Sequence, residues 1–155
     1  RRPELPPSTI WFSRSRKPSN VSRPSLPSRR FLLDTNVAVA LLNGEDAVVR
    51  REARERHVYL SIVTVAELIY GARRSGRASM NLDRCALLIA RRVVLGTDVN
   101  TAVHCADLRL RVEAAGKPIP QNDLWQAAIA RQMGLVVATR DRHFEGLPGV
   151  ESESW

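Results

Sequence analysis

The sequence predicts a three-layer α/β/α sandwich around a mainly parallel, Rossmann-like central sheet. Short runs in which every residue is apolar alternate with longer segments whose apolar residues recur at helical spacing. A strand that is apolar on every residue is buried on both faces, which is typical of parallel strands covered by helices. Helices between successive strands provide the right-handed crossovers that a parallel sheet requires. The fold class is therefore α/β.

The alternation of the two patterns places each element. Strands are expected at 31–34, 58–63, 93–96 and 135–139, with a last extended piece at 149–153. The segments between them carry helical spacing, and several have a capping residue at the start or a glycine at the end. Helices are expected at 37–42, 46–56, 64–76, 80–92, 98–116 and 122–134.

The basic charge of the chain lies almost entirely in its first thirty residues. The formal net charge is +8, but residues 1–30 hold eight Lys or Arg and one acid, whereas residues 31–155 hold sixteen and fifteen. Charge alone therefore does not make the domain a nucleic-acid binder. Residues 1–29 are rich in Pro and Ser without periodicity, which predicts a disordered leader before a domain over 30–155. Upstream sequence, an RNA-contacting arm and a targeting peptide stay open as explanations of that leader.

Two cysteines, Cys85 and Cys105, lie among apolar neighbours in predicted helices. Their small number favours reduced core residues of a cytoplasmic protein over a disulfide framework or a zinc site. No segment approaches the ~18 uninterrupted apolar residues of a membrane-spanning helix, so no membrane partner is expected.

Four acids fall where the predicted strands end or the following helices begin: Asp34, Glu67, Asp123 and Asp141. Because the carboxyl ends of parallel strands meet at one edge of a sheet, these acids can meet in one pocket. Carboxylates held close together raise each other's pKa, and a divalent cation removes that cost. Oxygen ligands select Mg²⁺ or Mn²⁺, ions suited to phosphodiester chemistry.

Each acid also has an ordinary structural explanation. Asp34 and its two neighbours could cap the next helix, and Thr64 with Glu67 has the spacing of a capping box. An acid in the first turn of a helix, such as Asp123, is favoured by the helix dipole, and Asp141 could be a turn residue. The three histidines, at positions 57, 104 and 143, are scattered without the spacing of metal ligands.

Three segments carry a resemblance to a known family: FLLDTNVAVALLNG, LSIVTVAELIYGA and GKPIPQNDLWQAAIARQMGLVVATRDRHFEGLPGV, in this order. Together they resemble a PIN domain, in particular the VapC-type ribonuclease toxins of bacterial toxin–antitoxin pairs, over residues 30–155. The resemblance implies a Mg²⁺- or Mn²⁺-dependent endoribonuclease that hydrolyses RNA phosphodiester bonds, the toxin of a type II toxin–antitoxin system.

The resemblance also implies roles for individual residues. It assigns metal binding and catalysis to the four acids, with two polar side chains in support: Asp34, Glu67, Asp123 and Asp141, with Asn36 and Thr139. It further implies a homodimer and a VapB-like antitoxin, for which the helices 37–42 and 46–56 could form a groove. Arginines 73, 74 and 77 are candidates for an RNA-binding rim, and a solvated helix end explains them equally well.

Two other functions stay open at this point. A phosphoacceptor domain of the receiver or haloacid dehalogenase type also places an Asp after a parallel strand, and GKP (116–118) superficially matches the Lys-Pro of a receiver. However, Lys117 does not follow a predicted strand, and Thr35 and Asn36 stand where a second acid is expected. The other alternative is a non-catalytic PIN-like scaffold that only binds an antitoxin or RNA.

Overall fold

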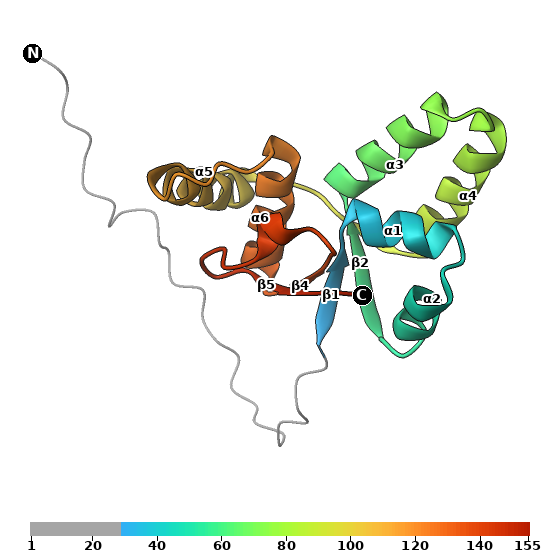
Figure 1. Ribbon diagram of the computed structural model, residues 1–155, viewed down its shortest axis with the longest axis horizontal. Coiled ribbons are helices and arrows are strands. Elements are labelled where there is room, and N and C mark those ends of the chain that lie inside the picture. Colours follow the sequence, from blue (N-terminus) through green and yellow to red (C-terminus); the bar gives the residue numbers. More distant parts are fainter. Residues whose placement is uncertain (1–28) are drawn as a thin grey trace, which may run out of the picture.

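A five-stranded parallel sheet forms the centre of the computed structural model, which describes residues 29–155 (Figure 1). The strand order is β3-β2-β1-β4-β5, and every neighbouring pair is parallel. From β1 the chain adds β2 and then β3 on one side, and it later adds β4 and β5 on the other side of β1. The strand order therefore reverses between β1 and β4. The strands are β1 (Arg30–Leu33), β2 (His57–Ser61), β3 (Val93–Leu95), β4 (Val136–Ala138) and β5 (Glu151–Glu153).

Helices cover both faces of this sheet, as the sequence predicts. Figure 1 shows α1 to α4 on one side of the strands and α5 with α6 on the other. The three-layer α/β/α architecture is therefore confirmed. The helices are α1 (Thr35–Leu42), α2 (Asp46–Glu52), α3 (Ile62–Arg74), α4 (Ala78–Ala90), α5 (Val99–Ala114) and α6 (Gln121–Met133), followed by the 3₁₀ turn η2 (Arg142–Phe144).

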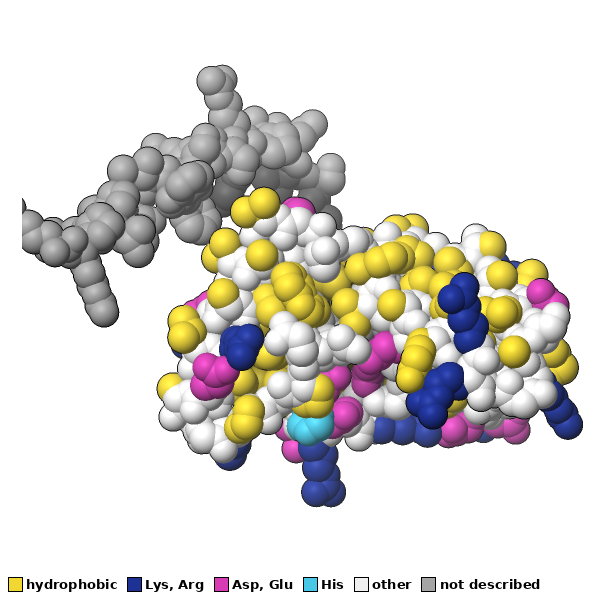
Figure 2. Space-filling view, turned by 90° about the horizontal axis from the view of Figure 1, so that it is seen from above, with side chains coloured by type: hydrophobic (Ala, Val, Ile, Leu, Met, Phe, Trp, Pro, Cys, Tyr) yellow, Lys and Arg dark blue, Asp and Glu magenta, His cyan; other side chains and the backbone are white. Residues whose placement is uncertain are grey.

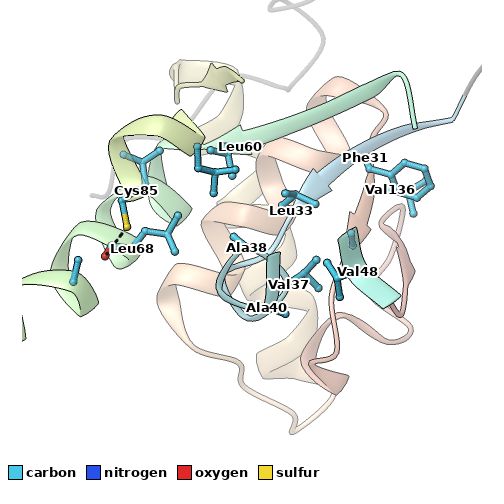
Figure 3. Close-up of a cluster of buried hydrophobic side chains, with 14 residues drawn as sticks. Phe31, Leu33, Val37, Ala38, Ala40, Val48, Leu60, Leu68, Cys85 and Val136 are labelled. Atoms are coloured by element: carbon cyan, nitrogen blue, oxygen red, sulfur yellow. Dashed lines mark hydrogen bonds between the residues drawn. The ribbon is translucent and has the colours of Figure 1, made fainter. Parts of the chain in front are cut away.

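The pleat of β1 divides the buried side chains into two cores. Phe31 and Leu33 face α1 to α4, where they join the cluster drawn in Figure 3. Leu32, between them, points to the opposite face and packs with residues of α5 and α6. Each core holds one of the two predicted reduced cysteines, since Cys85 and Cys105 are both buried and free.

The boundary between β2 and α3 differs from the prediction of a strand over 58–63. The Ser61 hydroxyl accepts a hydrogen bond from the backbone N–H of Thr64 at 2.9 Å and so caps α3. Ile62 and Val63 therefore lie in the first turn of the helix, although their apolar side chains suit a strand equally well. Starting the helix at Ile62 also removes the predicted capping box, because Glu67 then lies in the second turn.

The helix predicted at 46–56 ends at Glu52, and the remaining elements agree with the prediction to within a few residues.

The predicted leader falls outside the described residues except for Arg29, so the division into leader and domain stays a prediction. Among residues 29–155, no helix is both long and apolar enough to cross a membrane.

Candidate active site

All four predicted acids line one cavity at the carboxyl edge of the sheet. This acidic cavity has a volume of about 570 Å³ and lies where the strand order reverses between β1 and β4, the usual ligand position in open α/β sheets. Figure 2 views the molecule from this edge and shows acidic side chains gathered in a hollow near the middle, with a histidine beside them. The lining residues are Asp34, Thr35, Asn36, Val39, Glu67, Tyr70, Asp123 and Asp141.

Asp34 follows β1 at the floor of the acidic cavity and is only 6% exposed. Its Oδ1 accepts hydrogen bonds from the Thr35 backbone N–H and from Gln126 Nε2, both at 2.7 Å. Its Oδ2 accepts from Asn36 Nδ2 at 2.5 Å and from Thr139 Oγ1 at 2.6 Å. Asp34 therefore does cap α1, but the cap uses only one of four donors that together fix the carboxylate.

The electrostatics of Asp34 favour a cation nearby. Burial raises the pKa of Asp34 above its ordinary value of 3.8, and the negative charge of Glu67 raises it further. The hydrogen bonds from Thr139, Thr35 and Gln126 act in the opposite direction but do not cancel the effect of burial. A positive charge in the cavity would offset both the burial and the repulsion.

Glu67 reaches the same cavity from the second turn of α3. One of its carboxylate oxygens accepts a hydrogen bond from Thr35 Oγ1, and the other accepts from Asn122 Nδ2 at 2.7 Å. These partners come from α1 and α6, not from the start of α3 itself. The capping-box explanation of Glu67 is therefore wrong, and the side chain connects three helices at the cavity.

Asp123 and Asp141 share a histidine that the sequence analysis set aside. His143 Nδ1 lies 3.0 Å from Asp123 Oδ2 and 3.1 Å from Asp141 Oδ1. Burial raises the pKa of Asp123 above its ordinary value, and the charges of Asp34 and Asp141 add to this, while the hydrogen bond with His143 opposes it. The view that the histidines are scattered is thus wrong for His143. Its position two residues after Asp141 was the available signal.

Gln126 is the second site residue that the sequence analysis missed. It is 2% exposed, and its side-chain oxygen accepts hydrogen bonds from Ser61 Oγ at 2.9 Å and Thr64 Oγ1 at 2.6 Å while its nitrogen donates to Asp34. Gln126 follows Asp123 by three residues and so shares its helix face. A glutamine one helical turn after the candidate acid Asp123 was the signal.

The donor set fits a hard divalent cation. Carboxylates from β1, α3, α6 and the turn after β4 surround the cavity, and the two whose pKa values are raised, Asp34 and Asp123, gain from a nearby positive charge. Asp34 already has a donor for each lone pair, whereas Asp123 and Asp141 have fewer partners. The open side of the cluster therefore lies at Asp123 and Asp141.

Arg140, the residue before Asp141, has its guanidinium engaged outside the acidic cavity. Its guanidinium forms a bidentate ion pair with Glu45, and its Nε donates to the backbone oxygen of Trp155 at 2.6 Å. Its backbone N–H donates to Asn36 Oδ1 at 3.1 Å, which leaves the Asn36 amide group directed at Asp34. Arg140 thus orients Asn36 and joins the turn after β4 to the start of α2.

Comparisons with known proteins agree with this geometry. Residues 31–150 match the family model of the PIN domain. The chain is 33% identical over 129 residues to the tRNA(fMet)-specific endonuclease VapC of Shigella flexneri, covering 81% of this chain and 98% of the relative. Ribonuclease VapC5 of Mycobacterium tuberculosis is 32% identical, with 78% and 90% covered. The crystal structure of DNA-bound VapBC from Salmonella typhimurium superposes with a TM-score of 0.76 at 32% identity, over 82% of this chain and 98% of that chain.

Proposed function

Because the chain belongs to the PIN domain family, among its VapC members, we propose that it is a metal-dependent endoribonuclease and the toxin of a type II toxin–antitoxin system. The observation that carries the proposal is the convergence of Asp34, Glu67, Asp123 and Asp141 on one cavity. The curated relatives are named as ribonucleases or as a tRNA endonuclease, and the VapBC structure pairs such a protein with a second component.

The four acids would hold one or two divalent ions. Such an ion supplies a polarised water as nucleophile and neutralises charge on the scissile phosphate and the leaving oxygen. The protein itself orients the Asp34 carboxylate, because Asn36 and Thr139 donate hydrogen bonds to its Oδ2 and Gln126 donates one to its Oδ1. Glu67 is held by Thr35 and Asn122. The chain therefore keeps two of its carboxylates in fixed positions through its own hydrogen bonds.

RNA would be held by local contacts, since the domain carries almost no net charge. Tyr70 lines the acidic cavity and is 62% exposed. The Arg74 guanidinium lies 5.5 Å from the centre of its ring, and Arg74 Nη1 donates to the Tyr70 hydroxyl at 3.0 Å. An exposed ring next to a cationic group offers a stacking surface for a nucleotide base. Of the three arginines considered for an RNA rim, Arg74 has this additional support.

An antitoxin segment would bind beside the acids. A second cavity of about 330 Å³ adjoins Glu67 and is mainly apolar. It lies between α1, α3 and α4, whereas the sequence analysis expected a groove between α1 and α2. We propose that an apolar segment of a VapB-like partner fills it and directs a basic side chain at the acids. The lining residues are Thr35, Val39, Leu42, Asn43, Glu67, Leu68, Gly71, Ala72, Asn81, Arg84 and Cys85.

A homodimer is supported by one face of α5. Val99, Val103 and Leu110 are 80%, 63% and 68% exposed, and their spacing of four and seven residues places them along one side of the helix. A row of exposed apolar side chains on a helix is typical of a surface that another protein covers. Sedimentation of the wild-type protein and of Val103→Glu measures whether a second copy covers this face.

The test of the proposed activity uses natural RNA. The protein is incubated with tRNA, rRNA and mRNA in Mg²⁺, in Mn²⁺ and in EDTA, and the ends of the products are mapped. The proposal expects discrete internal cuts that require the ion. Cleavage that continues in EDTA contradicts it, and RNA binding without cleavage in either ion favours the non-catalytic scaffold. The phosphoacceptor alternative has no support, because Lys117 follows α5 and borders a different cavity.

A further inference from the structure

We propose that His143 supplies a nitrogen ligand to the catalytic ion, and that the site therefore prefers Mn²⁺ or a similar transition ion to Mg²⁺. This inference rests on the proposed function, because it concerns the metal of the same site. Four carboxylates alone would imply neither an imidazole ligand nor a preference for Mn²⁺ over Mg²⁺.

The imidazole of His143 lies beside the carboxylates of Asp123 and Asp141. The ligand atoms of Asp123, Asp141 and His143 all lie within 4.8 Å of one another. Two atoms that each bind an ion at about 2.1 Å are up to about 4.2 Å apart, so a small closing of the side chains brings all three to one ion. His143 Nδ1 already points between the two carboxylates, at 3.0 and 3.1 Å.

The turn η2 holds the backbone of His143 next to the acids. Asp141 caps η2, and its Oδ1 accepts the backbone N–H of His143 at 2.9 Å. The backbone N–H of Asp141 in turn donates to Thr139 Oγ1 at 2.9 Å, the same hydroxyl that donates to Asp34. The main chain of His143 is therefore tied to the acid cluster, which keeps its side chain within reach of Asp123 and Asp141.

The acids differ in how many of their lone pairs already accept hydrogen bonds from the protein. Both oxygens of Asp34 are occupied by protein donors, and each oxygen of Glu67 has one donor. Asp123 has His143 as its side-chain partner, so this corner of the cavity has the free ligand capacity. The His143 side chain is 45% exposed, and its Nδ1 faces the two carboxylates.

The chemical consequence follows from the ligand type. Mg²⁺ binds carboxylates, phosphates and water in preference to imidazole, whereas Mn²⁺ and the later divalent ions accept nitrogen more readily. Loss of the imidazole should therefore weaken Mn²⁺ binding far more than Mg²⁺ binding. A histidine that only donates a hydrogen bond to the carboxylates would produce no such difference.

The experiment reads the ligand directly. Electron spin echo envelope modulation of bound Mn²⁺ detects a coupled ¹⁴N nucleus when imidazole is a ligand. We compare the wild type with His143→Gln and with the matched control His57→Gln, whose exposed side chain lies at the start of β2, at the other edge of the sheet. Calorimetric titration then measures both ions against each protein.

We expect ¹⁴N coupling in the wild type and in His57→Gln and none in His143→Gln. Relative to the wild type, His143→Gln should bind Mn²⁺ about tenfold or more weakly, whereas its affinity for Mg²⁺ should stay within about threefold. Bound Mn²⁺ without ¹⁴N coupling, or coupling that persists in His143→Gln, overturns the inference. Ion-dependent RNA cleavage in that case leaves the proposed function intact. A wild-type protein that neither binds an ion nor cleaves RNA overturns both.

Discussion

Gln126 Nε2 lies 2.7 Å from Asp34 Oδ1, although 92 residues separate the two side chains. The other end of the same amide accepts hydrogen bonds from Ser61 and Thr64 at the start of α3. One buried glutamine therefore connects the end of β1, the start of α3 and the interior of α6. This connection fixes the floor of the acidic cavity before any ion binds.

Replacing Gln126 with Met should destabilise the protein strongly. The change keeps the volume but removes the oxygen that accepts from the hydroxyls of Ser61 and Thr64 and the nitrogen that donates to Asp34 Oδ1. We expect the free energy of unfolding to fall by about 2–4 kcal/mol in urea titrations. Gln121→Met is the matched control, because Gln121 is exposed on the same helix and should change stability by less than about 0.5 kcal/mol. Equal stability of the two variants would show that the buried network contributes little.

Replacing Glu67 with Gln should separate activity from folding. Glu67 lies in the second turn of α3 and caps no helix, so the variant should fold with nearly wild-type stability. The loss of one negative charge facing the cavity should lower the single-turnover rate of RNA cleavage by about 10²-fold or more. Wild-type cleavage together with a large loss of stability would instead assign Glu67 a structural role.

Tyr70 should affect RNA binding through its ring and not through its hydroxyl. Removing a stacked aromatic costs about 1–3 kcal/mol per base, so Tyr70→Ala should raise KM by about 5- to 150-fold with little change in kcat. Tyr70→Phe keeps the ring and should remain within about threefold of the wild type. If the two variants behave alike, the ring does not stack on the substrate.

Asp98 provides a pH-dependent contribution to stability that is independent of the metal. Its carboxylate caps α5, and hydrogen bonds from Thr101 lower the pKa of Asp98 below its ordinary value of 3.8. A lowered pKa gives stability that is present above pH ~4 and is lost as the pH falls through the folded-state pKa. Asn is also a good cap but does not titrate, so Asp98→Asn is the comparison.

Urea midpoints measured from pH 2 to 7 test this contribution. The difference between the wild type and Asp98→Asn should be constant near neutral pH and should shrink below pH ~4. A difference that grows as the pH falls would contradict the direction of the shift.

The fold could be predicted from local pattern because β1, β2, β3 and β4 each contain a short apolar run. The run at Phe31, Leu32 and Leu33 fits a strand buried on both faces, and α1, α3 and α5 begin at side-chain caps. The start of α3 could not be located, because Ile62 and Val63 fit a strand and a helix equally well. The Ser61 hydroxyl decides between them, and its partners become visible only in three dimensions.

The candidate site was partly predictable for a similar reason. Asp34 and Asp141 follow strands, and the topology of a parallel sheet brings such positions to one edge. His143 was only partly predictable: its position two residues after Asp141 was a signal, but its contact with Asp123 joins the turn η2 to α6 across 20 residues. Neither spacing nor composition reveals a contact of that kind.

The central claim is that Asp34 belongs to a metal-dependent ribonuclease site, and single-turnover cleavage of a mapped RNA substrate by Asp34→Asn tests it most directly. The wild type should cut in Mn²⁺ and stop in EDTA, and the variant should lose at least about 10²-fold in rate. A cooperative unfolding transition must show that the variant is folded. Cleavage by folded Asp34→Asn at the wild-type rate, or cleavage by the wild type in EDTA, would contradict the claim.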